Sequence, residues 1–237
     1  MSVPDDILIL LAAGSARRMQ AVVDDKITAM LAGKPVFIHA LQAFRDTGLI
    51  ARVLITYRDE AQLARLRSQL AAHLPAVAPV DFVLGGESRQ ESVLAALRTC
   101  AGHSGLVHIH DGARPLVSPE AICKVREKAR ETGAAILAGR AADTVKIAKA
   151  DSASVETSPE RGLVWTAETP QVFRTAVVIA GYRKVGELQR KVTDDSAAVA
   201  AVGQEISLVE NPSVNFKLTR PADFVLAEAI LRTRADQ

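Results

Sequence analysis

The stretch ILILLAA, residues 7–13, decides the fold class, because it is a continuous apolar run that is too short to cross a membrane. We interpret it as a strand covered on both faces, which is typical of a parallel sheet in an α/β domain. Similar runs recur at 51–57, 80–84, 106–110 and 134–139. Segments with apolar residues at helical spacing separate them. The chain therefore predicts repeated βαβ units and a mainly parallel, twisted sheet with helices on both faces.

Two of the predicted helices have clear boundary signals. In the segment 118–133, Ser118 is a suitable N-cap and Gly133 a suitable stop. The segment TDDSAAVAAVG begins with Thr193 as the expected cap and closes on Gly203. Both segments are therefore expected to be helices, the first before the strand at 134–139 and the second before the strand EISLVEN.

The residues from about 140 to 166 interrupt this alternation. The strand-like pieces DTVKIAK and GLVWTAE flank a polar centre, which predicts a β-hairpin arm that projects from the sheet. An isolated hairpin is marginally stable in water, so such an arm needs a partner surface, and a surface loop is the alternative. Because no linker divides the chain, residues 1–237 are expected to form a single domain with this arm.

Composition excludes several classes of function. The 237 residues are 49% hydrophobic, and 29 basic against 27 acidic residues give a net charge of +2, too balanced for a DNA-binding surface. Cys100 and Cys123 have no spacing typical of a disulfide scaffold or a zinc site, which favours a reducing compartment. Asp5 and Asp6 lie where a signal peptide would carry positive charge. We expect a cytoplasmic protein that binds neither nucleic acid nor membrane.

A candidate phosphate site follows the first predicted strand. Small residues up to Gly14 would let a ligand approach the backbone N–H groups, and Arg18 and Lys26 would supply positive charge. The pattern is neither a P-loop nor a dinucleotide-binding GxGxxG, since Ala16 stands at the second glycine. From these residues alone, an ordinary turn with solvated arginines is an equal alternative.

Two further glycine-bearing turns follow predicted strands. In HDGARPLV (110–117), Asp111 is placed to accept a ribose hydroxyl or to ligate a metal, and Gly112 allows a close turn. In LGGESRQES (84–92), a glycine pair precedes Ser92 at the start of a helix. Each is common in simple turns. Because the carboxyl ends of parallel strands share one edge, we expect the three turns to converge on one ligand.

Seven motifs appear together in the order of a known family. AAGSARRM with Lys26, GGESRQES, HDGARP, the DT of the arm, ETPQVF, VTDDSAA and NFKLTRPAD cover about residues 6–233. In the order and approximate spacing of these motifs, the chain resembles the 2-C-methyl-D-erythritol 4-phosphate cytidylyltransferase family. The resemblance implies a Rossmann-like nucleotidyltransferase fold, homodimers formed through interlocking β-arms, and transfer of CMP from CTP with Mg²⁺ in non-mevalonate isoprenoid biosynthesis.

The resemblance also implies roles for individual residues. Arg161 lies on the arm and is expected to serve the site of the neighbouring subunit. Asp111 is the candidate metal ligand, although the phosphates of CTP are expected to hold most of the Mg²⁺ coordination. Nucleotide binding is assigned to Ala12, Ala13, Gly14, Gly86, Arg89, Ser92, Asp111 and Gly112, catalysis to Arg18, Lys26, Arg161 and Lys217, and acceptor binding to Thr144, Arg161, Thr193 and Lys217.

The chain departs from the family pattern beside the catalytic lysine. The usual Pro-Lys-Gln is replaced by residues 24–27, Asp-Asp-Lys-Ile, with one additional residue after Arg18, and the usual Asp-Arg of the arm reads Glu160-Arg161. Two alternatives therefore stay open. One is a ribitol 5-phosphate cytidylyltransferase, and the other is a nucleotide-binding homologue whose altered loop lowers its activity. An NAD-binding module is disfavoured because no acidic residue follows a proper GxGxxG.

Overall fold

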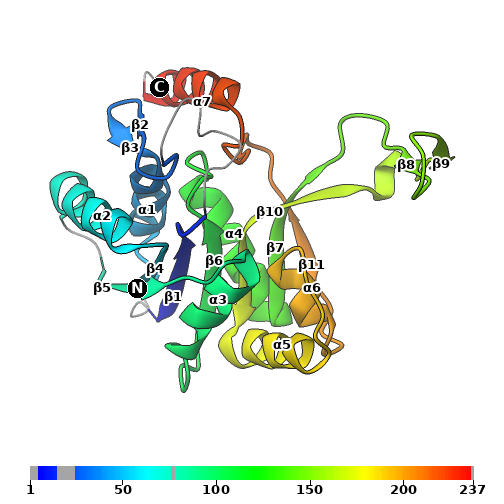
Figure 1. Cartoon of the computed structure of the whole chain (residues 1–237), viewed down its shortest axis with the longest axis horizontal. Coiled ribbons are helices and arrows are strands. Elements are labelled where there is room, and N and C mark those ends of the chain that lie inside the picture. Colours follow the sequence, from blue (N-terminus) through cyan, green and yellow to red (C-terminus); the bar gives the residue numbers. More distant parts are fainter. Residues whose placement is uncertain (1–4, 15–24, 76–77, 236–237) are drawn as a thin grey trace.

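A seven-stranded sheet forms the centre of the molecule in the computed structural model, which describes residues 5–14, 25–75 and 78–235. The strand order is β11-β7-β10-β6-β1-β4-β5 (Figure 1). Only β10 runs antiparallel to its neighbours, so the predicted mainly parallel α/β fold is confirmed. The strands are β1 (Asp6–Leu11), β4 (Ile50–Tyr57), β5 (Val80–Leu84), β6 (Leu106–Asp111), β7 (Ala134–Arg140), β10 (Trp165–Arg174) and β11 (Ser207–Glu210).

Alternation along β1 creates a core on each side of the sheet. Leu8 and Leu10 pack against one set of helices, while Ile7 and Ile9 pack against the other. Successive side chains of a strand point to opposite faces, so an uninterrupted apolar run fills both cores. One face is covered by α1 (Val36–Thr47), α2 (Glu60–His73) and α4 (Pro119–Thr132), and the other by α3 (Arg89–Arg98), α5 (Thr175–Glu187) and α6 (Asp195–Ala200).

The helix boundaries agree with one prediction and correct another. Ser118 caps α4 by accepting a hydrogen bond from the backbone N–H of Ala121, and Gly133 follows with φ of +90°. The prediction that Thr193 caps the later helix is wrong. Asp194 caps α6 instead, because its carboxylate accepts the N–H of Ala197 at 3.1 Å.

Residues 141–164 leave the sheet between β7 and β10 and project away from the body of the molecule (Figure 1). They contain β8 (Ile147–Ala148), which pairs antiparallel with β9 (Val155–Thr157), and a short 3₁₀ helix, η1 (Arg161–Leu163). At the base, the guanidinium of Arg140 lies 4.3 Å from the ring centre of Trp165. Ile147, Val155 and Leu163 are 46%, 56% and 76% exposed. This segment has the geometry of an arm with apolar side chains open to a partner.

A small cluster beyond the sheet supports the chain segment that carries Lys217. The hairpin of β2 (Met30–Leu31) and β3 (Lys34–Pro35) packs with α7 (Pro221–Ala235) around Leu218, which is fully buried. The carboxylate of Asp223 accepts the N–H groups of Thr219 and Arg220 and so fixes the turn into α7. No helix in the described part of the chain is long and apolar enough to span a membrane.

Candidate functional site

A cavity of about 610 Å³ opens at the carboxyl ends of β1, β4 and β6. Ligands of open α/β sheets bind at this edge because loops there can converge. All three predicted glycine-bearing turns contribute to its wall, together with the first turn of α3. The lining residues are Leu11, Ala13, Gly14, Lys26, Ile27, Thr56, Arg58, Gly86, Glu87, Ser88, Arg89, Ser92, Asp111, Ala113 and Lys217.

The glycine pair after β5 lets two turns approach closely. A Cβ atom at Gly85 would lie 2.6 Å from the Cβ of Ala13 and 2.8 Å from Oγ of Ser92, and no side chain could be accommodated there without displacement. The N–H of Gly86 donates to the same Oγ at 3.1 Å. These glycines therefore bring the start of α3 against the end of β1.

The N-terminal turn of α3 faces the cavity in a capped conformation. The hydroxyl of Ser88 accepts the N–H of Glu91, and the carboxylate of Glu91 accepts the N–H of Ser88. This capping box fixes the first turn, on which Ser88, Arg89 and Ser92 line the wall. The positive end of the helix dipole thus points toward the place where a phosphate would lie.

A buried ion network crosses the floor of the cavity. The guanidinium of Arg89 donates two hydrogen bonds to Asp195, at 3.0 and 2.7 Å, and a third to Asp111 at 3.2 Å. The ammonium of Lys217 lies 2.8 Å from the other oxygen of Asp111. Tyr182 donates to Asp195 at 2.6 Å. Residues from α3, α5, α6, β6 and the segment before α7 are thereby held in one arrangement.

Charge pairing sets the protonation states in this network. Burial by itself would raise the pKa of Asp111, but the positive charges of Arg89 and Lys217 outweigh burial and hold that pKa far below its usual range. Burial would likewise lower the pKa of Arg89, whereas Asp195 and Asp111 raise it. Burial and then the Asp195 carboxylate raise the pKa of Tyr182. Near neutral pH, Asp111 is ionised and Tyr182 is a hydrogen-bond donor.

A chain of hydrogen bonds beneath the floor fixes the backbone of Asp111. Its N–H donates to Oγ1 of Thr169 at 3.1 Å, and that hydroxyl lies 3.0 Å from Nδ1 of His110. Nε2 of His110 lies 3.1 Å from the carbonyl of Arg114, so it must carry the proton. Burial lowers the pKa of His110 to about 4. The imidazole is therefore neutral and accepts the proton of the Thr169 hydroxyl at Nδ1.

Lys26 lies on the wall between two buried neighbours. Asp25 and Ile27 are 5% and 2% exposed, and the Nζ of Lys26 donates to the carbonyl of Leu218 at 2.9 Å. This contact brings Lys26 beside the segment that carries Lys217. Arg18 lies outside the described residues. Lys26, the predicted catalytic lysine, therefore lies at the cavity despite the altered sequence beside it.

Two predicted nucleotide-binding residues, Ala12 and Gly112, do not line the cavity, and their contact with a nucleotide stays a prediction. Ala12 is fully buried, and its N–H donates to Oγ1 of Thr56 at 3.0 Å. The N–H of Gly112 also has a partner within the protein, because it donates to the carbonyl of Leu11 at 2.9 Å. Both residues shape the turns behind the wall. Ala13, Gly14, Gly86, Arg89, Ser92 and Asp111 line the cavity as predicted.

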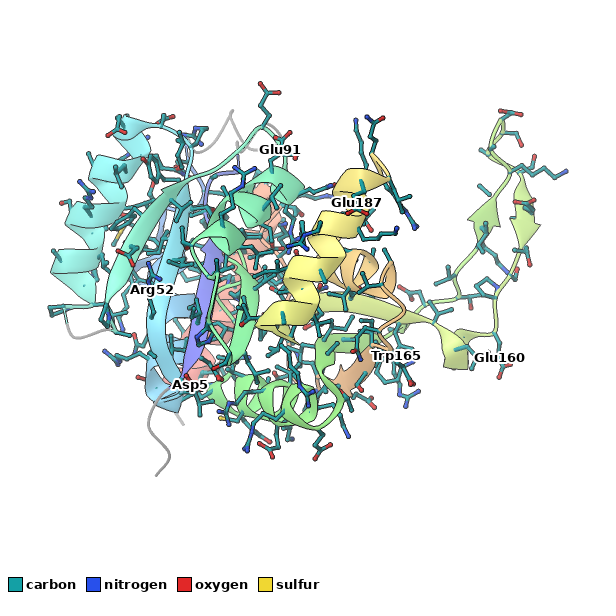
Figure 2. The ribbon with its side chains drawn as sticks, turned by 90° about the horizontal axis from the view of Figure 1, so that it is seen from below. Asp5, Arg52, Glu91, Glu160, Trp165 and Glu187 are labelled. Carbon is teal, nitrogen blue, oxygen red and sulfur yellow. The ribbon has the colours of Figure 1, made fainter. Side chains whose placement is uncertain are left out.

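Three predicted acceptor-binding residues lie outside this cavity in the single chain. Thr144 and Arg161 are exposed on the arm, where the guanidinium of Arg161 reaches only the carbonyl of Ala142, at 3.5 Å. Figure 2 shows Glu160, the neighbour of Arg161, far out from Glu91 on α3. Thr193 is exposed just before α6. Of the predicted acceptor residues, only Lys217 reaches the chain's own cavity.

Within the described ranges, the side chains do not form a metal site built by the protein alone. Among the described residues, no group of three or more His, Cys, Asp or Glu side chains is arranged to hold a metal ion. Asp111 stands alone, and its two oxygens already contact Arg89 and Lys217. A divalent cation bound there directly would lie beside three positive charges, since Arg114 is also 3.8 Å from Asp111.

Several residues of the cavity wall and floor were not predicted. Arg58, at the end of β4, adds a cation to the wall, and nothing in the sequence near it signals a site. Asp195, Gln171 and Asn215 fall within motifs quoted for the family, and their contacts show why. Gln171 accepts the N–H of Asp195, and Asn215 donates to the carbonyl of Thr169. These motif residues support the floor of the cavity from below.

Known proteins with similar sequences and folds share one description. The model of the 2-C-methyl-D-erythritol 4-phosphate cytidylyltransferase family matches residues 7–233. The proteins of that name from Rhodopirellula baltica and Bacillus velezensis are 38% and 34% identical, over 94% and 97% of this chain and 93% and 97% of theirs. The crystal structure of 4-diphosphocytidyl-2C-methyl-D-erythritol synthase from Anaerococcus prevotii superposes with a TM-score of 0.84 at 27% identity, covering 98% of this chain and 100% of that one.

Proposed function

The chain belongs to the 2-C-methyl-D-erythritol 4-phosphate cytidylyltransferase family, and we propose from this that it transfers CMP from CTP to 2-C-methyl-D-erythritol 4-phosphate with release of pyrophosphate. One observation carries the proposal. Lys26, Lys217 and the N-terminal turn of α3 meet at a single cavity beside the Gly14 turn. Positive charge and open backbone at one place suit a ligand with several phosphates.

The reaction needs positioning and positive charge rather than a proton acceptor. An oxygen of the acceptor phosphate attacks the α-phosphorus of CTP, a new P–O bond forms, and the bond to pyrophosphate breaks. The acceptor is already largely ionised near neutral pH because its second pKa is about 6. We assign to Lys26 and Arg18 the charge developing on the phosphoryl oxygens and to Lys217 the acceptor phosphate. We assign no proton transfer to His110, because it does not line the cavity and both its ring nitrogens are hydrogen-bonded.

We propose that the acceptor site is completed by the arm of a second copy of the chain. The apolar residues Ile147, Val155 and Leu163 would pack on that copy, and Arg161 and Thr144 would reach its cavity. A mixing experiment tests this. If Arg161 acts across the dimer, Lys26→Ala and Arg161→Ala chains together rebuild one intact site per mixed dimer, and about a quarter of the wild-type rate returns. If the two variants regain no activity after their subunits have been exchanged, the proposed role of the arm is contradicted.

We propose that Mg²⁺ enters with CTP and is held mainly by its phosphates, which is common for this ion. The proposal follows from the single, already paired Asp111 carboxylate. We also place the reaction in the cytoplasm, because Cys100 and Cys123 are free thiols, as expected in a reducing compartment.

Pyrophosphate release by the purified protein tests the proposed activity. CTP, UTP and GTP are each combined with methylerythritol phosphate or ribitol 5-phosphate in the presence of Mg²⁺. Release is expected only with CTP and methylerythritol phosphate. Release with ribitol phosphate instead would reassign the acceptor, and no release with any pair would reject the enzyme. Lys26→Ala should lower turnover by about a hundredfold, the size typical of losing one charge-stabilising group.

A further inference from the structure

The buried carboxylate of Asp25 stands directly before Lys26 in the chain. We propose that Asp25 is a positioning residue that is locked by Gln62 and holds Lys26 at the cavity wall. The inference rests on the proposed function, since Lys26 is taken as the cation that faces the reacting phosphates. Its basis is a set of hydrogen bonds that joins three chain segments behind the wall.

Each oxygen of Asp25 has its own partner. Oδ1 accepts the backbone N–H of Ile27 at 2.9 Å, which closes a tight turn around Lys26. Oδ2 accepts Nε2 of Gln62 at 2.6 Å, and Arg58 places Nη2 3.8 Å away. The side chain of Asp25 is 1% exposed. A buried carboxylate is tolerated only when it is hydrogen-bonded and near positive charge, and both conditions are met here.

Gln62 cannot reverse its amide to suit a different partner. Its Oε1 accepts the N–H of Arg58 at 2.7 Å, and Nε2 also donates to the carbonyl of Ala12 at 3.0 Å. A reversed amide would face donor to donor at Arg58 and acceptor to acceptor at Ala12. Gln62 is fully buried in the first turn of α2, which Asp59 caps. The hydrogen-bonded pair of Asp25 and Gln62, called the latch below, therefore connects the end of β1, the end of β4 and the Lys26 turn.

The latch restricts where the Lys26 side chain can go. Asp25 is held by Gln62, while the carbonyl of Ile27 accepts the N–H of Phe37 at 3.2 Å and its side chain packs in the core. Because both neighbours are buried, Lys26 points to the cavity, and its Nζ reaches the carbonyl of Leu218. Small displacements of a charge-stabilising group lower rates steeply. Loss of the latch should therefore reduce turnover through Lys26.

Asp25 does not act on the ligand directly. It does not line the cavity, and both its oxygens are occupied. A role as proton acceptor or metal ligand would need an open oxygen at the wall. Substitutions of Asp25 should therefore change turnover only by changing the position of Lys26.

A double-mutant cycle tests this route. Asp25→Ala and Gln62→Leu should each lower kcat about tenfold or more while the KM for the acceptor changes less than threefold. Asp25→Asn keeps an oxygen for Ile27 but turns an NH2 donor toward Nε2 of Gln62, and it should therefore also lower kcat. In a Lys26→Ala background, Asp25→Ala should cause no further loss, because the group it positions is absent. Asp81→Asn, an exposed carboxylate paired with Arg52, is the control for removal of a charge.

A second measurement does not depend on activity. Acetylation of Lys26 by acetic anhydride, followed by mass spectrometry, should be at least threefold faster in Asp25→Ala than in the wild type, and unchanged in Asp81→Asn. Unchanged labelling, or equal losses of kcat with and without Lys26, would overturn the proposal. If the wild type releases no pyrophosphate, the proposed function fails, and the labelling alone decides on the latch.

Discussion

Replacing Arg89 by alanine should destabilise the protein more than any other single change in the cavity floor. The substitution leaves Asp195, which is fully buried, with Tyr182 as its remaining side-chain partner. It also removes one of the three cations that lie within 4 Å of Asp111, and leaves Lys217 and Arg114. Removing one partner of a buried ion pair costs about 3–5 kcal/mol, because the remaining charge cannot be solvated. At 2–4 °C per kcal/mol for a chain of this size, Tm should fall by roughly 10 °C.

Replacing the partner, Asp195, by alanine should lower the free energy of unfolding less. In Asp195→Ala, Arg89 keeps its contact with Asp111, and its side chain is 27% exposed, so water can solvate the guanidinium. The hydroxyl of Tyr182 loses its acceptor, which costs about 1–3 kcal/mol. In the double variant no unpaired charge remains. Its loss of stability should therefore fall short of the sum of the single losses by about 1–3 kcal/mol.

Urea unfolding at pH 7, followed by circular dichroism, measures the free energy of unfolding of the three variants. The reasoning requires that Arg89→Ala is the least stable single variant and that the two losses are not additive. Equal losses, or a double variant whose loss equals the sum, would show that Asp195 is not a buried charge that depends on Arg89. Arg52→Ala, which removes an exposed pair, is the matched control and should cost under about 1 kcal/mol.

Three further predictions concern the turn, the buried histidine and the metal. Gly85→Ala should lower Tm by roughly 5 °C by overpacking against Ala13, whereas Gly186→Ala, which has open space around it, should not; equal melting temperatures would contradict this. The folded pKa of His110, about 4, lies below that of the unfolded chain. The unfolded state therefore binds more protons between these values, and the stability contributed by a neutral His110 should fall by about 2 kcal/mol from pH 7 to 5. Urea titrations at both pH values should show a smaller fall in His110→Asn. Chelation of divalent cations should abolish pyrophosphate release but leave Tm unchanged without CTP, and a lower Tm would indicate a metal held by the protein itself.

The fold could be predicted because its signals are local. The apolar runs at 7–13 and 106–110 have the length of strands, and they pair side by side as β1 and β6. The cap of α4 depends on Ser118 and residues within one turn of it. The cap of α6 was misplaced by one residue, because Thr193 and Asp194 are both good capping residues and only the backbone geometry distinguishes them.

The cavity wall was only partly predictable, for a different reason. Gly86 and Asp111 follow strands in recognisable turns, so convergence at one edge of the sheet identifies them, whereas Arg89 was assigned from the family resemblance. Asp195 lies 106 residues from Arg89, and its partnership with that residue leaves no local trace. The motif VTDDSAA marked the position without giving its role. Pairing of buried polar groups depends on tertiary contacts, and a single sequence contains no measure of them.

The segment before Lys26 shows how a missing motif residue can be replaced. In the usual Pro-Lys-Gln, proline restricts its own φ and so limits the conformations of the turn. Asp25 has no such restriction, and here the turn is fixed by hydrogen bonds to Ile27 and to Gln62. The bond to Ile27 is local, but the bond to Gln62 can form only when α2 has docked against β1, since Gln62 also binds the carbonyl of Ala12. In this chain the position of Lys26 therefore depends on packing of the α/β core, and substitutions in α2 that leave the cavity wall untouched should still change turnover.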